Sequence, residues 1–149
     1  ELRVEYDGRL SNSVVLEIAQ AAPAIFTLNS SGTGNAAALN QDGRANSSST
    51  PARLGEVVVL YATGIGTTSP PSADGAIQVG AGGHTNPVRA LIDGIDCEVS
   101  YSGPAPGLVA GVTQINITIP VSARTGNRQV ELVAAGRRSQ SGVLISLAP

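Results

Sequence analysis

Residues 112–119 read Val-Thr-Gln-Ile-Asn-Ile-Thr-Ile, and Pro120 follows them. In this stretch apolar side chains alternate with polar ones, and successive side chains of a β-strand point to opposite faces. The alternation therefore predicts a strand with one buried face, because an amphipathic helix would repeat about every 3.6 residues. Proline cannot donate a hydrogen bond to a neighbouring strand, so we expect the strand to end at Pro120.

The same period, or a short apolar run, recurs along the chain. Residues 57–60 read Val-Val-Val-Leu and predict a strand in the middle of a sheet. Asp93-Gly94 separates two further strand-like stretches, residues 88–92 and 95–101, and Asp-Gly tolerates the positive φ angles of a hairpin turn. Short strands with turn signals between them predict an all-β fold, an immunoglobulin-like antiparallel β-sandwich over residues 20–149. Further strands are expected at residues 24–28, 129–134 and 143–147, with a small hairpin around residues 41–43.

Composition limits the classes of function. The 149 residues suit one domain with a short appendage, and only 3% of them are aromatic, so the core must be aliphatic. Charged residues make up 13% and the net charge is −2, which disfavours nucleic-acid binding. No apolar run approaches the roughly 18 residues of a membrane-spanning helix. Because the sequence contains no Met, we expect that a leader peptide has been removed or that the chain belongs to a longer protein.

Residues 1–19 resemble the closing residues of the same chain. Both segments contain an apolar strand that ends in Gly-Arg, then a Ser-x-Ser sequence, then a second apolar strand. Gly8 and Gly136 lie 128 positions apart, about the length of one sandwich module, and only Gly142 has no counterpart. A fixed period is typical of tandem modules, so residues 1–19 are interpreted as a spare pair of closing strands. The matched ranges are 2–8 with 130–136, 8–13 with 136–141, and 14–19 with 143–148.

This N-terminal strand pair has an apolar face that two strands cannot bury. An isolated two-stranded hairpin is marginally stable in water, so the pair needs a larger sheet. The sheet can belong to the same module, to an upstream module or to another subunit, and strand addition between subunits joins sandwich domains. Head-to-tail contacts of this kind do not close on themselves and give filaments. The predicted interface residues are Leu2, Val4, Tyr6, Val14, Leu16 and Ile18.

Residues 22–27 read Ala-Pro-Ala-Ile-Phe-Thr, and residues 57–66 read Val-Val-Val-Leu-Tyr-Ala-Thr-Gly-Ile-Gly. With further motifs they resemble a module found at the C-terminal ends of large secreted proteins of Solibacter-type acidobacteria. The resemblance covers residues 20–149 and implies a bacterial, exported protein with an immunoglobulin-like fold. It implies no catalytic residue, because the family has no established activity. The further motifs lie at residues 34–43, 74–77, 101–109 and 114–120.

Candidate catalytic and metal-binding groups are few. His84 is the single imidazole and lies in a Gly-rich loop, where we expect it to be exposed rather than part of a catalytic triad. One His and one Cys cannot supply the ligands of a zinc site, and Cys97 is expected to be a small core residue. Calcium stays open as an alternative, although turn formation explains the same oxygen-bearing residues. Those residues are Asn40, Asp42 and Asn46 in one loop, and Asp93 with Asp96 in another.

Taken together, the sequence predicts a structural subunit of an extracellular bacterial assembly, either a filament or a surface layer. Addition of the N-terminal strand pair to a neighbouring sheet would join the subunits, and the partners would be copies of the chain or an upstream module. The alternative is an accessory spacer, or a surface- or glycan-binding module, of a large secreted protein. With three Tyr and no Trp, the chain has few aromatic side chains from which to form a carbohydrate-binding surface. An enzyme is not favoured, and no cofactor or metal is predicted.

Overall fold

The computed structural model describes residues 1–80 and 82–149, which contain strands but no helix. The predicted all-β fold is therefore confirmed. Nothing in this part of the chain forms a helix long and apolar enough to cross a membrane. The strands are β1 Glu5–Tyr6, β2 Arg9–Leu10, β3 Ala24–Ile25, β4 Gly34–Asn35, β5 Ala38–Leu39, β6 Ala52–Arg53, β7 Val57–Thr63, β8 Thr68–Ser69, β9 Gly83–His84, β10 Val88–Ile92, β11 Ile95–Pro104, β12 Thr113–Thr118, β13 Gly126–Ala134, β14 Arg137–Arg138 and β15 Val143–Ala148.

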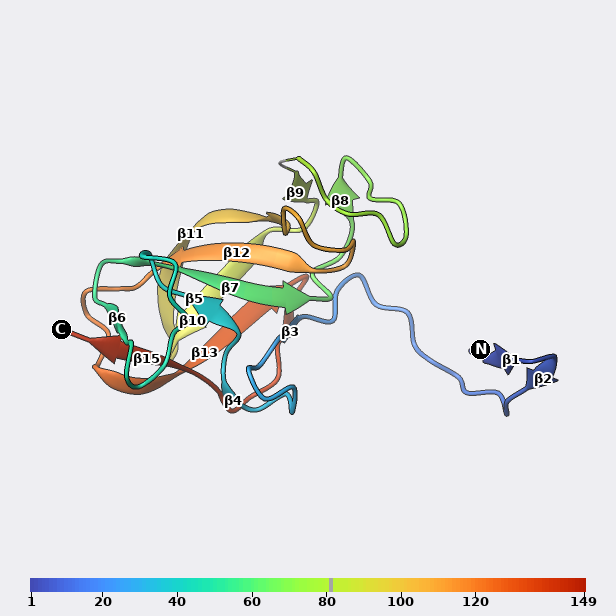
Figure 1. Ribbon diagram of the computed structural model, residues 1–149, viewed down its shortest axis with the longest axis horizontal. Coiled ribbons are helices and arrows are strands. Elements are labelled where there is room, and N and C mark those ends of the chain that lie inside the picture. Colours follow the sequence, from blue (N-terminus) through green and yellow to red (C-terminus); the bar gives the residue numbers. More distant parts are fainter. Residues whose placement is uncertain (81) are drawn as a thin grey trace.

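One sheet of 11 strands makes up most of the molecule. Its order is β3-β7-β12-β11-β10-β13-β15-β4, with β5 and β6 attached at the sides and β14 paired to β13. The sheet curls round, so that β7 and β12 pass in front of β10 and β13 (Figure 1). Aliphatic side chains from the facing strands fill the interior. They include Val58, Leu60, Ala90, Ile92, Ile115, Ile117, Val130, Leu132, Val143 and Ile145.

The alternation in residues 112–119 reappears as alternate burial. β12 buries Thr113, Ile115 and Ile117, while the side chains between them are partly exposed. It pairs antiparallel with β7 on one side and with β11 on the other. β7 lies inside the sheet as predicted, because β3 and β5 pair with its second edge.

The predicted hairpin at Asp93-Gly94 is also present. Asp93 and Gly94 adopt φ angles of 48° and 82°, and β10 returns as β11 directly after them. β11 is longer than predicted, because after Cys97 it leaves β10 and pairs with β12 instead. A register shift between Val99 and Tyr101 accompanies this change of partner, as β-bulges commonly do where a strand bends.

Asn46 connects the loop after β5 to the last strand. Its side chain is buried, and its Oδ1 accepts a hydrogen bond from the Ser146 N–H at 2.7 Å. Its Nδ2 donates to Ser146 O and to Asn40 Oδ1, both at 2.9 Å. The Asn46 side-chain amide thus bonds to the backbone of β15 as a neighbouring strand would. Sequence reasoning assigns this residue to a polar loop, because a turn asparagine and a buried bridging asparagine look the same in sequence.

The last long strand of the sheet, β15, has partners on both sides. β15 pairs with β13 on one edge, and on the other with β4 at its start and β6 near its end, both in parallel. Asn46 bonds to β15 between these two short strands. Unpaired edges are templates for unwanted strand addition, so this covering protects the body from pairing with other chains along β15.

Asn46→Ala should destabilise the fold by about 1–3 kcal/mol, because the backbone groups of Ser146 would stay buried without partners. Urea denaturation followed by circular dichroism measures the loss. Ser48→Ala is the matched control, since Ser48 lies in the same loop and is exposed. Equal stability of the two variants would contradict the role assigned to Asn46.

Candidate functional site

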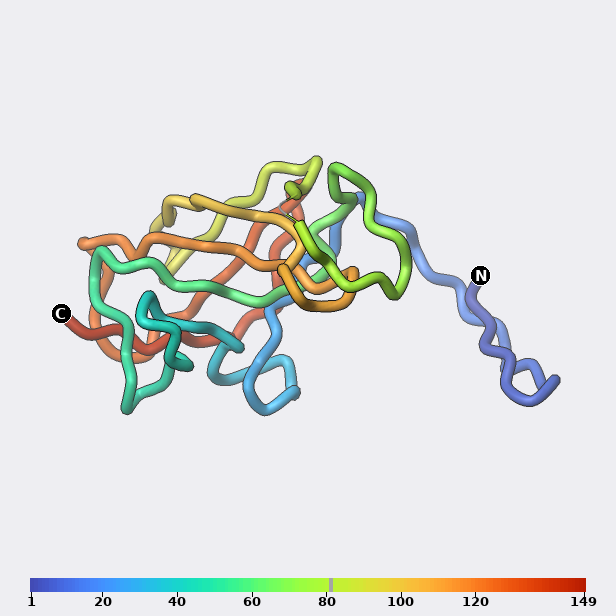
Figure 2. Tube along the Cα trace, turned by 45° about the horizontal axis from the view of Figure 1, so that its top comes forward, coloured from blue at the N-terminus to red at the C-terminus, as the bar shows by residue number. Residues whose placement is uncertain are grey.

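Residues 1–20 lie apart from the body of the molecule, residues 21–149, and all of them are exposed. Figures 1 and 2 show β1 and β2 at the far end of an extended segment that leads away from the body. The body begins at Ala21, which is 4% exposed, and the Ala22 N–H donates to Gly64 O at 2.7 Å. Gly64 permits this approach because a Cβ at its position would overlap Ala22 O. The segment is therefore anchored at its body end only.

All six predicted interface residues lie on this exposed segment. Tyr6 is in β1, and Leu2 pairs with Val14 through two backbone hydrogen bonds of 2.7 and 3.0 Å. Leu16 and Ile18 lie beyond the last paired residue. The exposed fractions are Leu2 52%, Val4 58%, Tyr6 83%, Val14 46%, Leu16 57% and Ile18 101%.

The return strand differs from the sequence-based expectation. The alternation over residues 14–18 predicts a paired strand there, whereas the structure starts the return at Arg9 and pairs only as far as Val14. The reason is the two-residue turn at Asp7-Gly8, which brings the chain back at once and makes Tyr6 and Arg9 partners. Leu10, 63% exposed, thereby joins the hairpin although the sequence pattern did not single it out.

The turn of this hairpin matches the turn that closes the body. Asp7 and Gly8 have φ angles of 49° and 69°, and Ala135 and Gly136 have φ angles of 46° and 75°. Positive φ at both central residues defines the hairpin turn whose twist suits two antiparallel strands. The register also agrees on both sides of the turn. The pairs are Glu5↔Leu10 and Tyr6↔Arg9 in the N-terminal hairpin, and Val133↔Arg138 and Ala134↔Arg137 in the body.

One serine repeats its hydrogen bonds in both hairpins. The Ser11 N–H donates to Val4 O at 2.9 Å, and Ser11 Oγ accepts from the Val4 N–H at 3.0 Å. In the body, the Ser139 N–H donates to Leu132 O at 2.8 Å, and Ser139 Oγ accepts from the Leu132 N–H at 3.0 Å. The likeness seen in the sequence thus extends to side-chain geometry.

The apolar residues of the two segments have the same composition but opposite environments. Five matched positions contain two Val, two Leu and one Ile in each segment. In the body all five are at most 3% exposed, whereas in the N-terminal segment all are exposed. Residues 1–19 therefore expose the apolar positions whose counterparts β13 and β15 bury. The five pairs are Leu2 with Val130, Val4 with Leu132, Val14 with Val143, Leu16 with Ile145 and Ile18 with Leu147.

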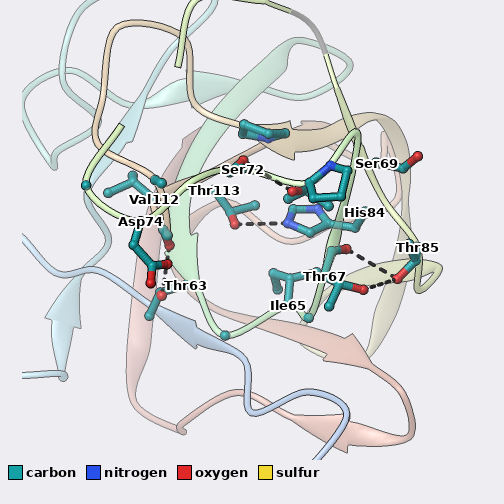
Figure 3. A pocket seen from close by; sticks show the side chains of 18 residues that line it. Thr63, Ile65, Thr67, Ser69, Ser72, Asp74, His84, Thr85, Val112 and Thr113 are labelled. Atoms are coloured by element: carbon teal, nitrogen blue, oxygen red, sulfur yellow. Dashed lines mark hydrogen bonds between the residues drawn. The ribbon is translucent and has the colours of Figure 1, made fainter. Parts of the chain in front are cut away.

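A pocket of about 650 Å³ lies beside Gly64, the residue that holds the start of the body. Loop residues between β7 and β9 line it together with residues 110–113 before and in β12. Several lining side chains carry hydroxyls, and the ionisable ones are His84 and Asp74. In Figure 3, Asp74 lies away from the imidazole.

His84, in β9, bonds to side chains of β11 and β12 instead of forming a catalytic triad. Its Nε2 lies 3.2 Å from Thr113 Oγ1 in β12 (Figure 3). Its Nδ1 lies 3.0 Å from Ser102 Oγ in β11. Both ring nitrogens therefore have hydroxyl partners, and within the described residues no carboxylate is hydrogen-bonded to the ring. The expectation of an exposed loop histidine is wrong, since the side chain is half-buried between β11 and β12. Burial lowers the pKa of His84.

The oxygen-bearing loop residues considered for calcium already have other partners. Asn40 and Asn46 bond to each other, and Asp42 pairs with Arg44, which holds the pKa of the Asp42 carboxyl below its usual value. In the second loop, Asp93 accepts from the Gln129 N–H. Asp96 accepts three hydrogen bonds from the Arg89 guanidinium, at 2.7, 2.8 and 3.0 Å. These oxygens serve the turns and strand pairs around them.

Cys97 is a core residue, as predicted. It is 8% exposed within the hydrophobic core cluster, and burial raises the pKa of its thiol to about 11. At neutral pH the group is therefore a thiol rather than the reactive thiolate.

Comparison with known proteins adds no assignment. No family model, curated protein or solved structure matches the chain. The candidate interface therefore rests on the geometry of residues 1–19.

His84 makes the stability of the fold dependent on pH. The pKa of His84 in the folded chain is lowered from 6.5. Its contribution to the free energy of unfolding is therefore present above pH 6.5 and is lost as the pH falls through the lower, folded-state pKa. Thermal unfolding should show a lower Tm at about pH 5 than at about pH 7. Carboxylates stay largely ionised over this whole range, so they do not account for the difference. His84→Gln should remove most of this difference, since it is the only histidine. An unchanged pH dependence in the variant would refute this assignment.

Proposed function

We propose that this protein is a structural module of an extracellular bacterial assembly and that residues 1–19 are its docking element. These residues complete the sheet of a second β-sandwich module by strand addition, so that modules follow one another head to tail. The main-chain ladder supplies the pairing, and the alternate apolar side chains enter the core of the acceptor.

One observation carries this proposal: residues 1–19 repeat the hairpin that closes the body, with its face exposed. The turn, the register and the serine hydrogen bonds agree, and the five apolar positions have the same overall composition. A hairpin with this face is stable only against a larger sheet. An acceptor built like this body, but without its own closing strands, would offer that sheet.

The strand order supports an immunoglobulin-like sandwich as the fold of each module. Such domains place strands A, B, E and D in one sheet and C, F and G in the other. Here β3, β7, β12 and β11 follow one another in the sheet, and β10, β13 and β15 continue it. We propose that these two groups correspond to the two layers, with β11 passing from one to the other. On this assignment, residues 1–19 correspond to strands F and G.

The extracellular setting rests on the resemblance of residues 20–149 to the exported acidobacterial module. Two arrangements share the docking element and differ in where the acceptor lies. In a filament or surface layer the acceptor belongs to another subunit, and in a spacer it precedes the module in one polypeptide. The exposed hairpin supports strand addition in both arrangements.

A hairpin transplant tests the proposal. Residues 130–148 are replaced by the sequence of residues 2–19, with Gly142 retained between the copies of Ser13 and Val14. Ala134, Gln140 and Ser146 are also retained. Because the exchanged core residues conserve volume, this chimera should unfold cooperatively in urea, with a loss on the order of 1–3 kcal/mol.

The matched control is the same chimera with Asp at the positions of Val4 and Leu16. Its two buried charges should abolish cooperative unfolding. If the first chimera is as disordered as this control, residues 1–19 are not a closing hairpin and the proposed function fails.

A further inference from the structure

We infer that the acceptor of residues 1–19 is a β-sandwich module related to this body but not identical to it. It lacks its own closing hairpin, has room for the aromatic ring of Tyr6, and gives the Glu17 carboxylate a solvated or basic environment. The inference rests on the proposed function and names the kind of partner that the docking element fits.

The first misfit between the N-terminal segment and this body is Tyr6. The shared register places Tyr6 where the body has Ala134, since Tyr6 pairs with Arg9 and Ala134 with Arg137. Ala134 is 1% exposed and also pairs with Val88 of β10. A tyrosine at this place would have to enter a filled core, and overpacking forces side chains off their rotamers. The acceptor must therefore have a smaller neighbour or a cavity at this position.

The second misfit is Glu17. It corresponds to Ser146 of β15, which is 3% exposed. Ser146 is held on both sides, because its N–H donates to Asn46 Oδ1 and its Oγ donates to Asn127 Oδ1 at 2.8 Å. A carboxylate placed there would be buried without a cationic partner, which is strongly unfavourable. The acceptor must differ in this place as well.

The strand edges that are already paired in this body lead to the same conclusion. In this body β13 already pairs with β10, and β15 already pairs with β13, β4 and β6. A second copy of the chain could accept residues 1–19 at the equivalent place only by releasing its own closing hairpin. That exchange would replace two fitting residues, Ala134 and Ser146, by two that do not fit. Copies of this chain are therefore poor acceptors for one another.

Two substitutions in the full chain test the inference. Ala134→Tyr and Ser146→Glu introduce the two misfits one at a time, and each should lower the Tm by about 5–10 °C. Val133→Tyr is the control, since Val133 precedes Ala134 and is only partly buried. Light scattering after size-exclusion chromatography should show the unmodified chain as a monomer over a wide concentration range.

The outcomes separate the inference from the proposed function. If Ala134→Tyr and Ser146→Glu are as stable as the unmodified chain, this body can accept the segment and the inference is wrong. Polymers that disappear on deletion of residues 1–19 would also overturn it, while leaving strand addition as the function. Failure of the hairpin transplant would instead remove the proposed function itself.

Discussion

The hairpin of β13, β14 and β15 keeps its structure because one of its faces lies in the core of the body. Val130, Leu132, Val143 and Ile145 are at most 1% exposed, and β10 supplies the neighbouring strand. Two strands alone do not provide such burial. Residues 1–19 carry the same turn and the same apolar pattern without a sheet beneath them. The apolar side chains of the closing strands are thus buried against a larger sheet, whereas those of residues 1–19 are not.

Under the proposed function, this asymmetry is the basis of assembly. The polar groups that first suggest chemistry are engaged internally: His84 bonds to two hydroxyls, and Asp42 pairs with Arg44. β7 and β15 have partners on both edges, so the body resists strand addition along these strands. The apolar face of the N-terminal segment has no such cover. Under the proposed function, Tyr6 and Glu17 would then determine which module accepts it.

Alternation and turn chemistry explain how much of this could be predicted from sequence. A period of two predicts β12 with the correct buried residues, and Asp93-Gly94 predicts the β10–β11 hairpin. Sequence likeness between the two ends predicts a pair of strands in residues 1–19, although not their register, because pairing depends on the turn at Asp7-Gly8. The internal positions of Asn46 and His84 could not be predicted. Both depend on strands distant in sequence, and their neighbours look like ordinary loops.

Hydrogen exchange of matched amides tests the central claim most directly. The N–H groups of Val4 and Ser11 make the same hydrogen bonds as those of Leu132 and Ser139, but only the latter pair is buried in a sheet. In the monomeric chain the Val4 and Ser11 amides should exchange fast, and the Leu132 and Ser139 amides should be strongly protected. Equal protection of the two pairs in a monomer would contradict this claim, because residues 1–19 would then be docked on their own body.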